Sequence, residues 1–271
     1  MPVLALSQWH LNGGAVGDEV TPYYEEPGIV IYCGDARKIV PELEAVDMIF
    51  TDPPYGHNNN DGDLIHKREA ALGLSPSCES GPRPIQNDGH EEASDLVRWL
   101  FEQSNRLLRH GGCCCCCCCC CCGGGPDPQF ARWSLWMDEV LDFKQMVVWD
   151  KGPMGMGWHY RRSYETVLVG QKPGGKCKWY DETDRIENII RHIPKIIPRS
   201  VEHPTPKPPK LAAHFIKLHT QAGETVLDPF MGAGSTAEAA KLLGRNFIGI
   251  ELEERWCQLA VERLGQSVLP L

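Results

Sequence analysis

The chain has 271 residues, of which 42% are hydrophobic and 23% are charged, with a formal net charge of −9 at pH 7. This ordinary composition and length fit one large α/β domain spanning residues 1–271. No apolar stretch approaches the roughly 18 residues that a membrane span needs, and the N-terminal segment lacks the pattern of a signal peptide, so we expect a cytoplasmic protein with no membrane partner.

Short apolar segments alternate with amphipathic ones along the chain. After an irregular segment at 1–28, we predict strands at 29–33, 46–50, 113–122, 145–149, 165–170, 224–228 and 247–250. We predict helices at 36–43, 91–108, 133–141, 211–219, 235–243 and 253–264. This alternation predicts an α/β fold with a mostly parallel, twisted sheet and helices on both faces. Residues 56–90 lack periodicity and are predicted to form a mobile loop.

Ten of the 14 cysteines form an unbroken run at 113–122, which is not a spaced disulfide framework. On a strand, side chains on the same face lie about 6.6 Å apart, too far for thiolates that share one zinc ion. We therefore predict a buried strand in which cysteine acts as a small apolar residue, and no metal site. A low-complexity expansion would account for the same run.

Positive charge is concentrated in one part of the chain. Between Lys151 and Lys217 there are 13 Lys and Arg against 6 Asp and Glu. Because phosphate neutralisation supplies most non-specific affinity for nucleic acid, a polyanion would bind here. A solvated surface of mixed charge would explain the same composition. Within this part, residues 171–203 are predicted to form a small insertion.

Acidic residues stand at the ends of four predicted strands. Asp35, Asp52 and Asp228 each precede a turn, and Glu251 directly follows the strand at 247–250. Ligands of parallel sheets bind at the carboxyl ends of the strands, so we expect these carboxylates to face one crevice. Taken singly, each acid would be interpreted as a turn or cap residue.

Residues 228–236 (DPFMGAGST) have the pattern of a strand end, a tight glycine turn and a helix start. Gly232 and Gly234 allow a ligand to approach the backbone closely, and Ser235 or Thr236 can cap the helix. The segment is not a P-loop and keeps only a relaxed form of the dinucleotide fingerprint. Glu251 stands where an acid holds ribose hydroxyls. The pattern indicates an adenosine-containing cofactor, and it leaves NAD open.

Residues 51–56 (TDPPYG) favour a site for an amino group on a planar ring. Pro53 and Pro54 remove two N–H donors, which leaves carbonyls facing the crevice. Asp52 adds a carboxylate acceptor, and Tyr55 offers a face on which a base can stack, worth about 1–3 kcal/mol. A proline-rich turn with a chance tyrosine is the structural alternative.

Together, the DPPY and DPFMGAGST segments resemble the amino-methyltransferases of DNA, in the beta-group order with the DPPY tetrad first. The pairs Gly34-Asp35 and Tyr164-Glu165, the WDK at 149–151 and the HPTPKP at 203–208 are similar to that pattern. The resemblance covers roughly residues 22–265 and implies a Rossmann-like fold with S-adenosyl-L-methionine as cofactor. The cysteine run departs from the mixed apolar strand that is usual in the family.

The resemblance also implies roles for individual residues. Asp52 and the Pro53 carbonyl would hold the adenine amino group, Pro54 completes the tetrad, and Tyr55 would stack on the base. The implied cofactor pocket contains Asp35, Thr205, Lys207, Asp228, Phe230, Gly232, Gly234, Ser235, Thr236 and Glu251. Of these, Asp35 is placed near the cofactor's adenine ring, Glu251 at the ribose hydroxyls, and Thr205 and Lys207 near the methionine end.

Target recognition is expected in the basic segment 172–199. Candidate DNA-binding residues are Arg161, Arg162, Lys176, Lys178, Arg185, Arg191, Lys195 and Arg199. Because adenine is inaccessible inside a duplex, the base must be flipped into the pocket. Asp52 and a carbonyl would then polarise the N6–H group while the nitrogen attacks the sulfonium methyl in line, without a metal or a cysteine nucleophile.

The predicted function is therefore site-specific methylation of adenine N6 in double-stranded DNA. Cytosine N4 methylation is the alternative, because cytosine also offers an exocyclic amine; the family more often has Ser at position 52 for cytosine. A non-catalytic DNA-binding homologue would not need both motifs intact, and a NAD-dependent oxidoreductase leaves DPPY without a role. The resemblance permits a homodimer, and any endonuclease of a restriction-modification system is expected on a separate chain.

Overall fold

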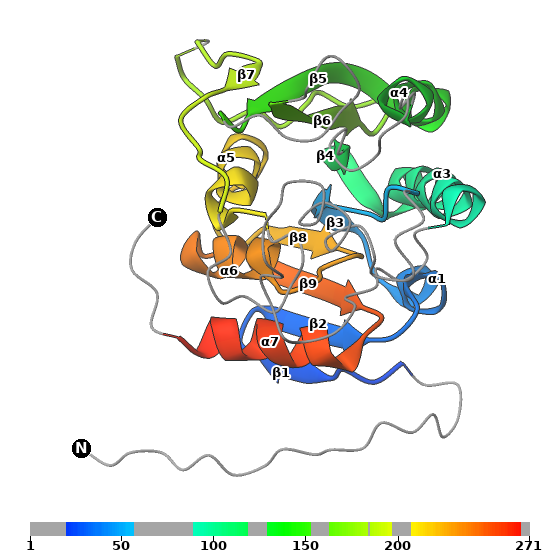
Figure 1. The fold of residues 1–271 in the computed structure, drawn as a ribbon, viewed down its shortest axis with the longest axis vertical. Helices are drawn as coiled ribbons and strands as arrows, with labels where there is room; N and C mark the ends of the chain where they lie inside the picture. The colour runs from blue at the N-terminus through cyan, green and yellow to red at the C-terminus, as the bar shows by residue number, and fades with distance from the viewer. Residues whose placement is uncertain are drawn as a thin grey trace, which may run out of the picture.

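A computed structural model describes residues 20–56, 89–118, 129–152, 163–183, 185–196 and 207–266. Its centre is a nine-stranded sheet with the order β1-β2-β9-β8-β3-β4-β6-β5-β7 (Figure 1). The strands are β1 (Tyr24–Glu26), β2 (Ile29–Cys33), β3 (Val46–Thr51), β4 (Leu108–Cys118), β5 (Asp142–Asp150), β6 (Tyr164–Gln171), β7 (Ile189–Ile190), β8 (Thr225–Asp228) and β9 (Asn246–Glu251).

Most neighbouring strands are parallel, as predicted. The consecutive pairs from β2 through β9, β8 and β3 to β4 are all parallel, and so is the pair β5–β7. The exceptions are β1 at one edge and β6, which runs antiparallel to both β4 and β5. Because β6 reverses between them, β4 and β5 point the same way, and their carboxyl ends lie on the same edge of the sheet as that of β3.

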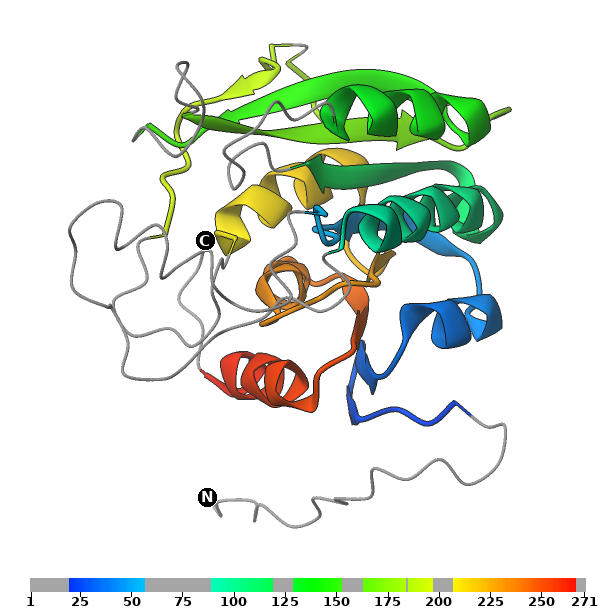
Figure 2. The same cartoon turned by 45° about the vertical axis from the view of Figure 1, so that its right-hand side comes forward.

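Helices cover both faces of the sheet (Figure 2). They are α1 (Ala36–Ile39) with the 3-10 turn η1 (Val40–Glu42), α3 (His90–Leu107), α4 (Gln129–Val140), α5 (Pro209–His219), α6 (Ser235–Leu242) and α7 (Glu254–Gly265). Residues of α5, α6 and α7 pack in one hydrophobic cluster, and residues of α1, α3 and α4 pack in the other. The predicted fold class is confirmed.

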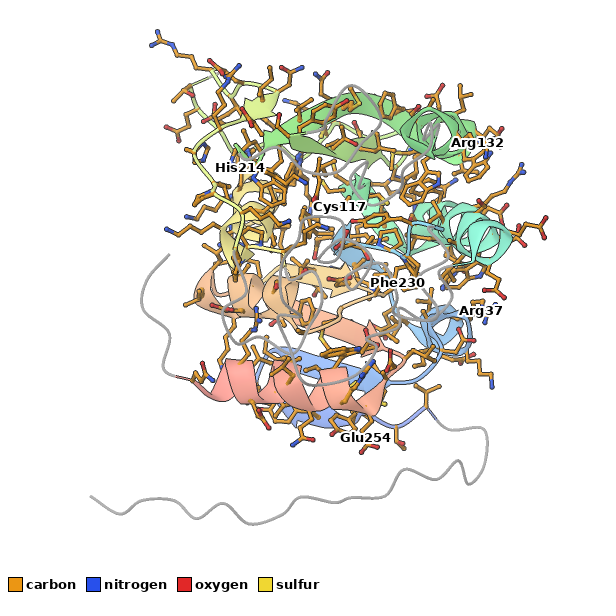
Figure 3. All side chains as sticks on the ribbon, in the orientation of Figure 1. Arg37, Cys117, Arg132, His214, Phe230 and Glu254 are labelled. Carbon is orange, nitrogen blue, oxygen red and sulfur yellow. The ribbon has the colours of Figure 1, made fainter. Side chains whose placement is uncertain are left out.

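The cysteines of β4 pack against the helices on both faces of the sheet. Cys115 and Cys117 point into the cluster with α5, whereas Cys114 and Cys116 point into the cluster with α3, because successive side chains on a strand alternate between faces. Cys117 lies in the interior of the molecule (Figure 3). The predicted strand is thus confirmed up to residue 118 and its burial up to Cys117, and residues 119–122 lie outside the described part.

The sequence prediction differs from the structure at a few positions. β1 lies in the segment predicted to be irregular, and the two-residue β7 lies in the predicted insertion. The helix predicted at 36–43 is only one α-helical turn, which continues as the 3-10 turn containing Pro41. Proline lacks the N–H that a longer α-helix would need there. The predicted mobile loop falls almost entirely at residues 57–88, outside the described residues.

Within the described residues, no helix combines the length and the hydropathy needed to cross a membrane.

Candidate active site

The four strand-end acids come together at one edge of the sheet. The strands that precede them, β2, β9, β8 and β3, are consecutive parallel neighbours. Their carboxyl ends therefore lie side by side, and Asp35, Glu251, Asp228 and Asp52 occupy adjacent positions along this edge. Asp35 caps α1 by accepting a hydrogen bond from the backbone N–H of Arg37 at 2.9 Å.

Asp228 joins the DPPY strand to the glycine loop. Its Oδ1 accepts hydrogen bonds from the Thr51 hydroxyl (2.8 Å) and the Phe230 N–H (3.1 Å), and its Oδ2 accepts one from the Thr236 hydroxyl (2.6 Å). Asp228 is buried, which raises its pKa to about 6 against the opposing effect of these hydrogen bonds. This carboxylate connects Thr51, the neighbour of Asp52, to the glycine loop, so the two sequence motifs belong to one site.

Glu251 holds the glycine loop from the other side. Its two carboxylate oxygens accept hydrogen bonds from the N–H groups of Gly232 and Glu253, each at 2.9 Å. Burial raises the pKa of Glu251 to about 7. Gly232 and Gly234 both have positive φ, 53° and 78°, and a Cβ on Gly234 would lie 2.7 Å from the Cβ of Ala260 in α7. The second glycine is therefore required by packing as well as by the turn.

The predicted capping of α6 by Ser235 or Thr236 is wrong. The cap residue is Gly234 itself, and no side chain caps the helix. The tight turn gives both hydroxyls other partners, since Thr236 donates to Asp228 and Ser235 accepts from Arg263 at 3.1 Å. Thr236 thus belongs to the Asp228 hydrogen-bond network, whereas Ser235 contacts α7.

A lysine distant in sequence lies within the DPPY tetrad. The Lys207 Nζ lies 2.8 Å from Asp52 Oδ2 and donates a hydrogen bond to the Tyr55 hydroxyl at 2.9 Å. The Tyr55 hydroxyl in turn donates to Asp52 Oδ1. The weakly solvated surroundings of Asp52 raise its pKa to about 6, although the Lys207 charge opposes this shift. Lys207 therefore contacts the tetrad directly, a contact that the sequence did not indicate.

Two further charged residues support this lysine. Glu165 in β6 lies 3.2 Å from the Lys207 Nζ through Oε2, and its Oε1 accepts a hydrogen bond from Lys151 at 2.9 Å. Burial alone would raise the pKa of Glu165, but Lys207 and Lys151 hold it at about 2. The sequence analysis gave these two residues no role beyond the family pattern. The signal for each was a charged residue beside an apolar strand, Lys151 directly after β5 and Glu165 near the start of β6.

An aromatic neighbour positions the predicted stacking residue. Trp133 in α4 is fully buried, and its ring stacks on that of Tyr55 with centroids 6.2 Å apart and an interplanar angle of 28°. The sequence analysis missed this contact, because helical periodicity indicates only that Trp133 faces inward. We conclude that α4 restricts the orientation of Tyr55.

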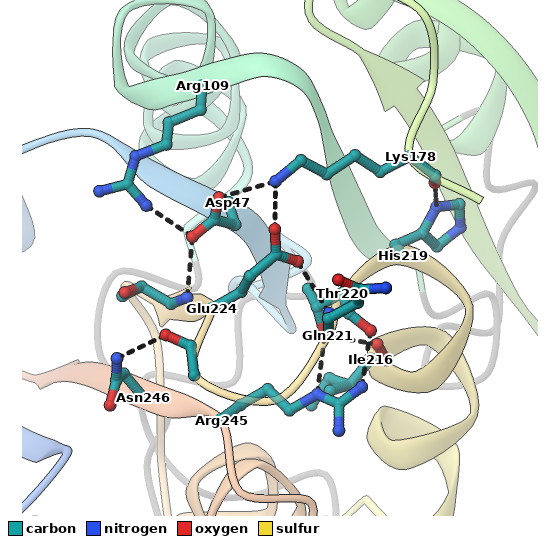
Figure 4. A network of polar contacts seen from close by, with 12 residues as sticks. Asp47, Arg109, Lys178, Ile216, His219, Thr220, Gln221, Glu224, Arg245 and Asn246 are labelled. Atoms are coloured by element: carbon teal, nitrogen blue, oxygen red, sulfur yellow. Dashed lines mark hydrogen bonds and ion pairs between the residues drawn. The ribbon is translucent and has the colours of Figure 1, made fainter. Parts of the chain in front are cut away.

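The predicted DNA-binding residues of segment 172–199 do not all lie together. Lys176 and Lys178 lie at the amino edge of the sheet, where β3, β4 and β8 begin. Lys178 lies at the amino ends of β3 and β8, where it pairs with Asp47 at 2.8 Å and with Glu224 (Figure 4). In the structure its ammonium is held by these two carboxylates, at the opposite end of β3 from Asp52. Lys176 packs beside Gly111 at the amino end of β4, and Arg185 precedes β7, so both also lie away from Asp52.

Two further predicted DNA-binding residues follow β7, but the side chain of Arg191 turns back toward Glu187 and lines a cavity beside α5. Arg191 and Lys195 follow β7, which runs parallel to β5, and both are exposed. Arg191 forms an ion pair with Glu187 at 2.7 Å. The predictions for Arg161, Arg162, Arg199 and Thr205 fall outside the described residues.

The acids at neighbouring parallel strand ends, the glycine loop after β8 and the Asp52 cluster define an α/β enzyme with its site at the carboxyl edge of the sheet. A family model described as DNA methylase matches residues 46–262. The chain therefore belongs to the DNA methylase family, and the family predicted from the sequence is confirmed.

Similar proteins agree with this assignment over most of their length. The Type II methyltransferase M2.DpnII of Streptococcus pneumoniae is 25% identical over 264 residues, covering 90% of this chain and 92% of that protein. DNA adenine methyltransferase YhdJ of Escherichia coli (strain K12) is 24% identical over 284 residues, covering 92% and 86%. The crystal structure of the M1.HpyAVI-SAM complex has a TM-score of 0.62 and 26% identity, covering 88% of this chain and 99% of that one.

Proposed function

We propose that this chain transfers a methyl group from S-adenosyl-L-methionine to N6 of adenine in DNA. The observation that carries the proposal is the Asp228 junction, because it connects the acceptor cluster of Asp52 directly to the glycine loop. The amino-group site and the cofactor site are thus two halves of one rigid edge. Such preorganisation is what in-line transfer between two bound molecules requires.

The residues at this edge fit the cofactor. Glu251 is a strand-end carboxylate whose oxygens each accept one backbone N–H, and each oxygen has a further lone pair that could accept a ribose hydroxyl. Asp35, Phe230 and Gly232 would complete the pocket. The similar M1.HpyAVI structure is a complex with SAM, which supports this choice. When bound, the cofactor supplies a methyl group on a positively charged sulfur.

The Asp52 cluster fits an amino group. In the structure, the Lys207 ammonium lies where an N–H donor can reach both Asp52 and the Tyr55 hydroxyl. An exocyclic amine presented here would donate one hydrogen to Asp52 and the other to a carbonyl of the proline pair. The carboxylate then stabilises the positive charge that develops on the nitrogen. Glu165 keeps Lys207 bound beside Asp52, and Lys207 helps to keep Asp52 ionised.

Adenine is favoured over cytosine as the target base. The acid at position 52 and the likeness to an enzyme named DNA adenine methyltransferase support adenine. Cytosine N4 presents the same two hydrogens and is the second candidate. Incubation of duplex DNA with the cofactor, followed by digestion and nucleoside mass spectrometry, separates the two. We expect N6-methyladenine; N4-methylcytosine would contradict the choice of base, and neither product despite cofactor binding would indicate a non-catalytic DNA-binding homologue.

We further propose that DNA binds across the carboxyl edge and that the exposed cations Arg191 and Lys195, which follow β7, contact its phosphates. We expect this chain to act in the cytoplasm, because its proposed substrate is DNA. The likeness to a Type II methyltransferase supports a restriction-modification role with the endonuclease on a separate chain. Light scattering on the purified protein, with and without DNA, tests for the homodimer.

A further inference from the structure

Two cysteines and a histidine meet at the amino edge of the sheet, away from Asp52. Cys113 comes from the first part of β4, Cys177 from the segment after β6, and His219 from the last residue of α5. The two sulfurs lie 3.3 Å apart, and one ligand atom from each of the three residues lies within 4.8 Å of the others. Cys113 and His219 are buried, whereas Cys177 is half-buried.

Backbone contacts hold these side chains in place. The His219 Nδ1 lies 3.2 Å from the carbonyl oxygen of Lys178, a contact drawn in Figure 4. If Nδ1 donates to this carbonyl, Nε2 is left with its lone pair available to a ligand, which is the arrangement common among metal-binding histidines. The segment carrying Cys177 is held against β4, because Lys178 N donates to Gly111 O at 3.0 Å and Lys172 N donates to Gly112 O at 3.1 Å.

We propose that Cys113, Cys177 and His219 form a zinc site with water as the fourth ligand. Zinc favours thiolate and imidazole ligands in a tetrahedral arrangement, and two thiolates on one zinc ion lie about 3.8 Å apart. The observed sulfur separation therefore needs only a small opening. Each thiol releases its proton on binding, the imidazole binds as a neutral ligand, and zinc stays divalent, so no oxidant or reductant takes part.

The surroundings provide a route for the ion. A cavity of about 800 Å³ is lined by Cys177 and His219, together with Trp179, His214 and Leu218. It reaches the two ligands beside α5 and has room for the water ligand and its hydrogen-bond partners. Bound zinc would connect β4, the segment after β6 and α5, so we expect zinc binding to stabilise the fold at this edge.

This site does not conflict with the spacing argument against a metal in the cysteine run. Neighbouring cysteines of one strand are too far apart to bind the same zinc ion, and the proposed site does not require them to do so. The proposed site takes a single cysteine from the run, and its other two ligands come from segments 64 and 106 residues further along the chain, which the fold brings to Cys113.

Metal titration of the full chain tests the proposal. We expect the reduced, metal-free protein to bind one equivalent of Co²⁺ with a sulfur-to-cobalt charge-transfer band, which Zn²⁺ then abolishes. Cys177→Ser and His219→Gln should each lose the band, whereas the control Cys33→Ser, at an exposed cysteine far from the cluster, should keep it. Binding by other cysteines of the run would survive Cys177→Ser and would overturn the proposal.

A second measurement on the unaltered protein covers the case in which a variant fails to fold. Bound Zn²⁺ should slow alkylation of Cys177 by at least tenfold, measured by peptide mass spectrometry, while alkylation of Cys33 stays unchanged. Equal alkylation of Cys177 with and without zinc contradicts the site. A Cys113–Cys177 disulfide that persists in reductant and leaves no zinc binding would contradict it as well.

Discussion

Asp47 and Asp52 lie near opposite ends of the same strand, β3, and their surroundings shift their pKa values in opposite directions. Asp47, at the amino edge, forms ion pairs with Arg109 and Lys178 and accepts the N–H of Thr225 at 2.9 Å. Burial alone would raise its pKa, but the hydrogen bonds and the positive charges of these partners outweigh that effect, so the pKa lies below the usual 3.8. At the carboxyl edge, burial outweighs Lys207 and raises the pKa of Asp52 to about 6.

The difference indicates that the charged residues of the amino edge contribute to stability and that the carboxylates of the carboxyl edge contribute to function. At the amino edge, Asp47 and Glu224 are paired with Arg109 and Lys178, so removal of one partner is expected to destabilise the folded chain. At the carboxyl edge, Asp52, Asp228 and Glu251 all have raised pKa values because burial disfavours their charged forms. Perturbed carboxylates of this kind cluster at functional sites. Substitutions at the two edges should therefore change different measured quantities.

The largest expected effect follows from Asp52→Ala. Loss of the carboxylate acceptor should lower the rate of methyl transfer by about 1000-fold, the size typical of removing a preorganised charge-stabilising group. Cofactor affinity should change little, since Glu251 and the glycine loop stay in place. Transfer of a labelled methyl group measures the rate, and calorimetry measures the affinity for the cofactor. A variant with normal turnover would contradict the role of Asp52.

Asp47→Ala should show the opposite pattern. It removes a carboxylate that is only 5% exposed and that Arg109 and Lys178 share, while Lys178 keeps Glu224. We therefore expect the free energy of unfolding to fall by about 2 kcal/mol, the size of a lost hydrogen bond to a charged group. The turnover of the remaining folded protein should stay within about twofold of the original, because the site lies at the other edge. Chemical denaturation and methyl transfer on the same preparation test both parts, and a large loss of turnover in folded protein would contradict the separation.

Lys207→Gln should lower the rate at neutral pH by about tenfold and move the acid limb of the pH profile. Asp52 must be ionised to accept an N–H, so the rate of the original protein should fall as pH drops through about 6. Removing the cation that opposes the rise in the Asp52 pKa should move this limb to higher pH. Lys207→Arg retains the charge and should leave the limb in place. An unmoved limb in Lys207→Gln would show that another group titrates.

The smallest effect is expected for Thr236→Val, which removes one hydroxyl donor from Asp228. The free energy of unfolding should fall by about 1 kcal/mol, the usual net contribution of one hydrogen bond. Because this hydroxyl stabilises the ionised carboxylate, the loss should be greater above pH 6 than below it. Denaturation at both pH values measures the effect, and Thr236→Ser, which keeps the hydroxyl, should show little change.

Much of this fold could be predicted from local patterns. Most strand and helix centres followed from runs such as IVIYC at 29–33 and from helical spacing around Leu96 and Leu100, because burial on a strand or a helix imposes its own period. The short elements β1 and β7 and the reversal of β6 could not be predicted this way. β1 pairs with the adjacent β2 but has only three residues, too few to show a period. β7 pairs with β5 and β6 with β4, and a local pattern carries no information on such contacts between distant segments.

The sequence by itself determined the strand-end acids, the glycine loop and the family, because each depends on residues close together in the chain. Only the tertiary structure decided which charges meet. It brought Lys207 to Tyr55 across 152 residues, and it paired Lys178 with Asp47 across 131 residues. It also joined one cysteine of the run to Cys177 and His219. The physical reason is that an ion pair or a ligand set depends on which strand ends share an edge, and that follows from the order and direction of the strands in the sheet.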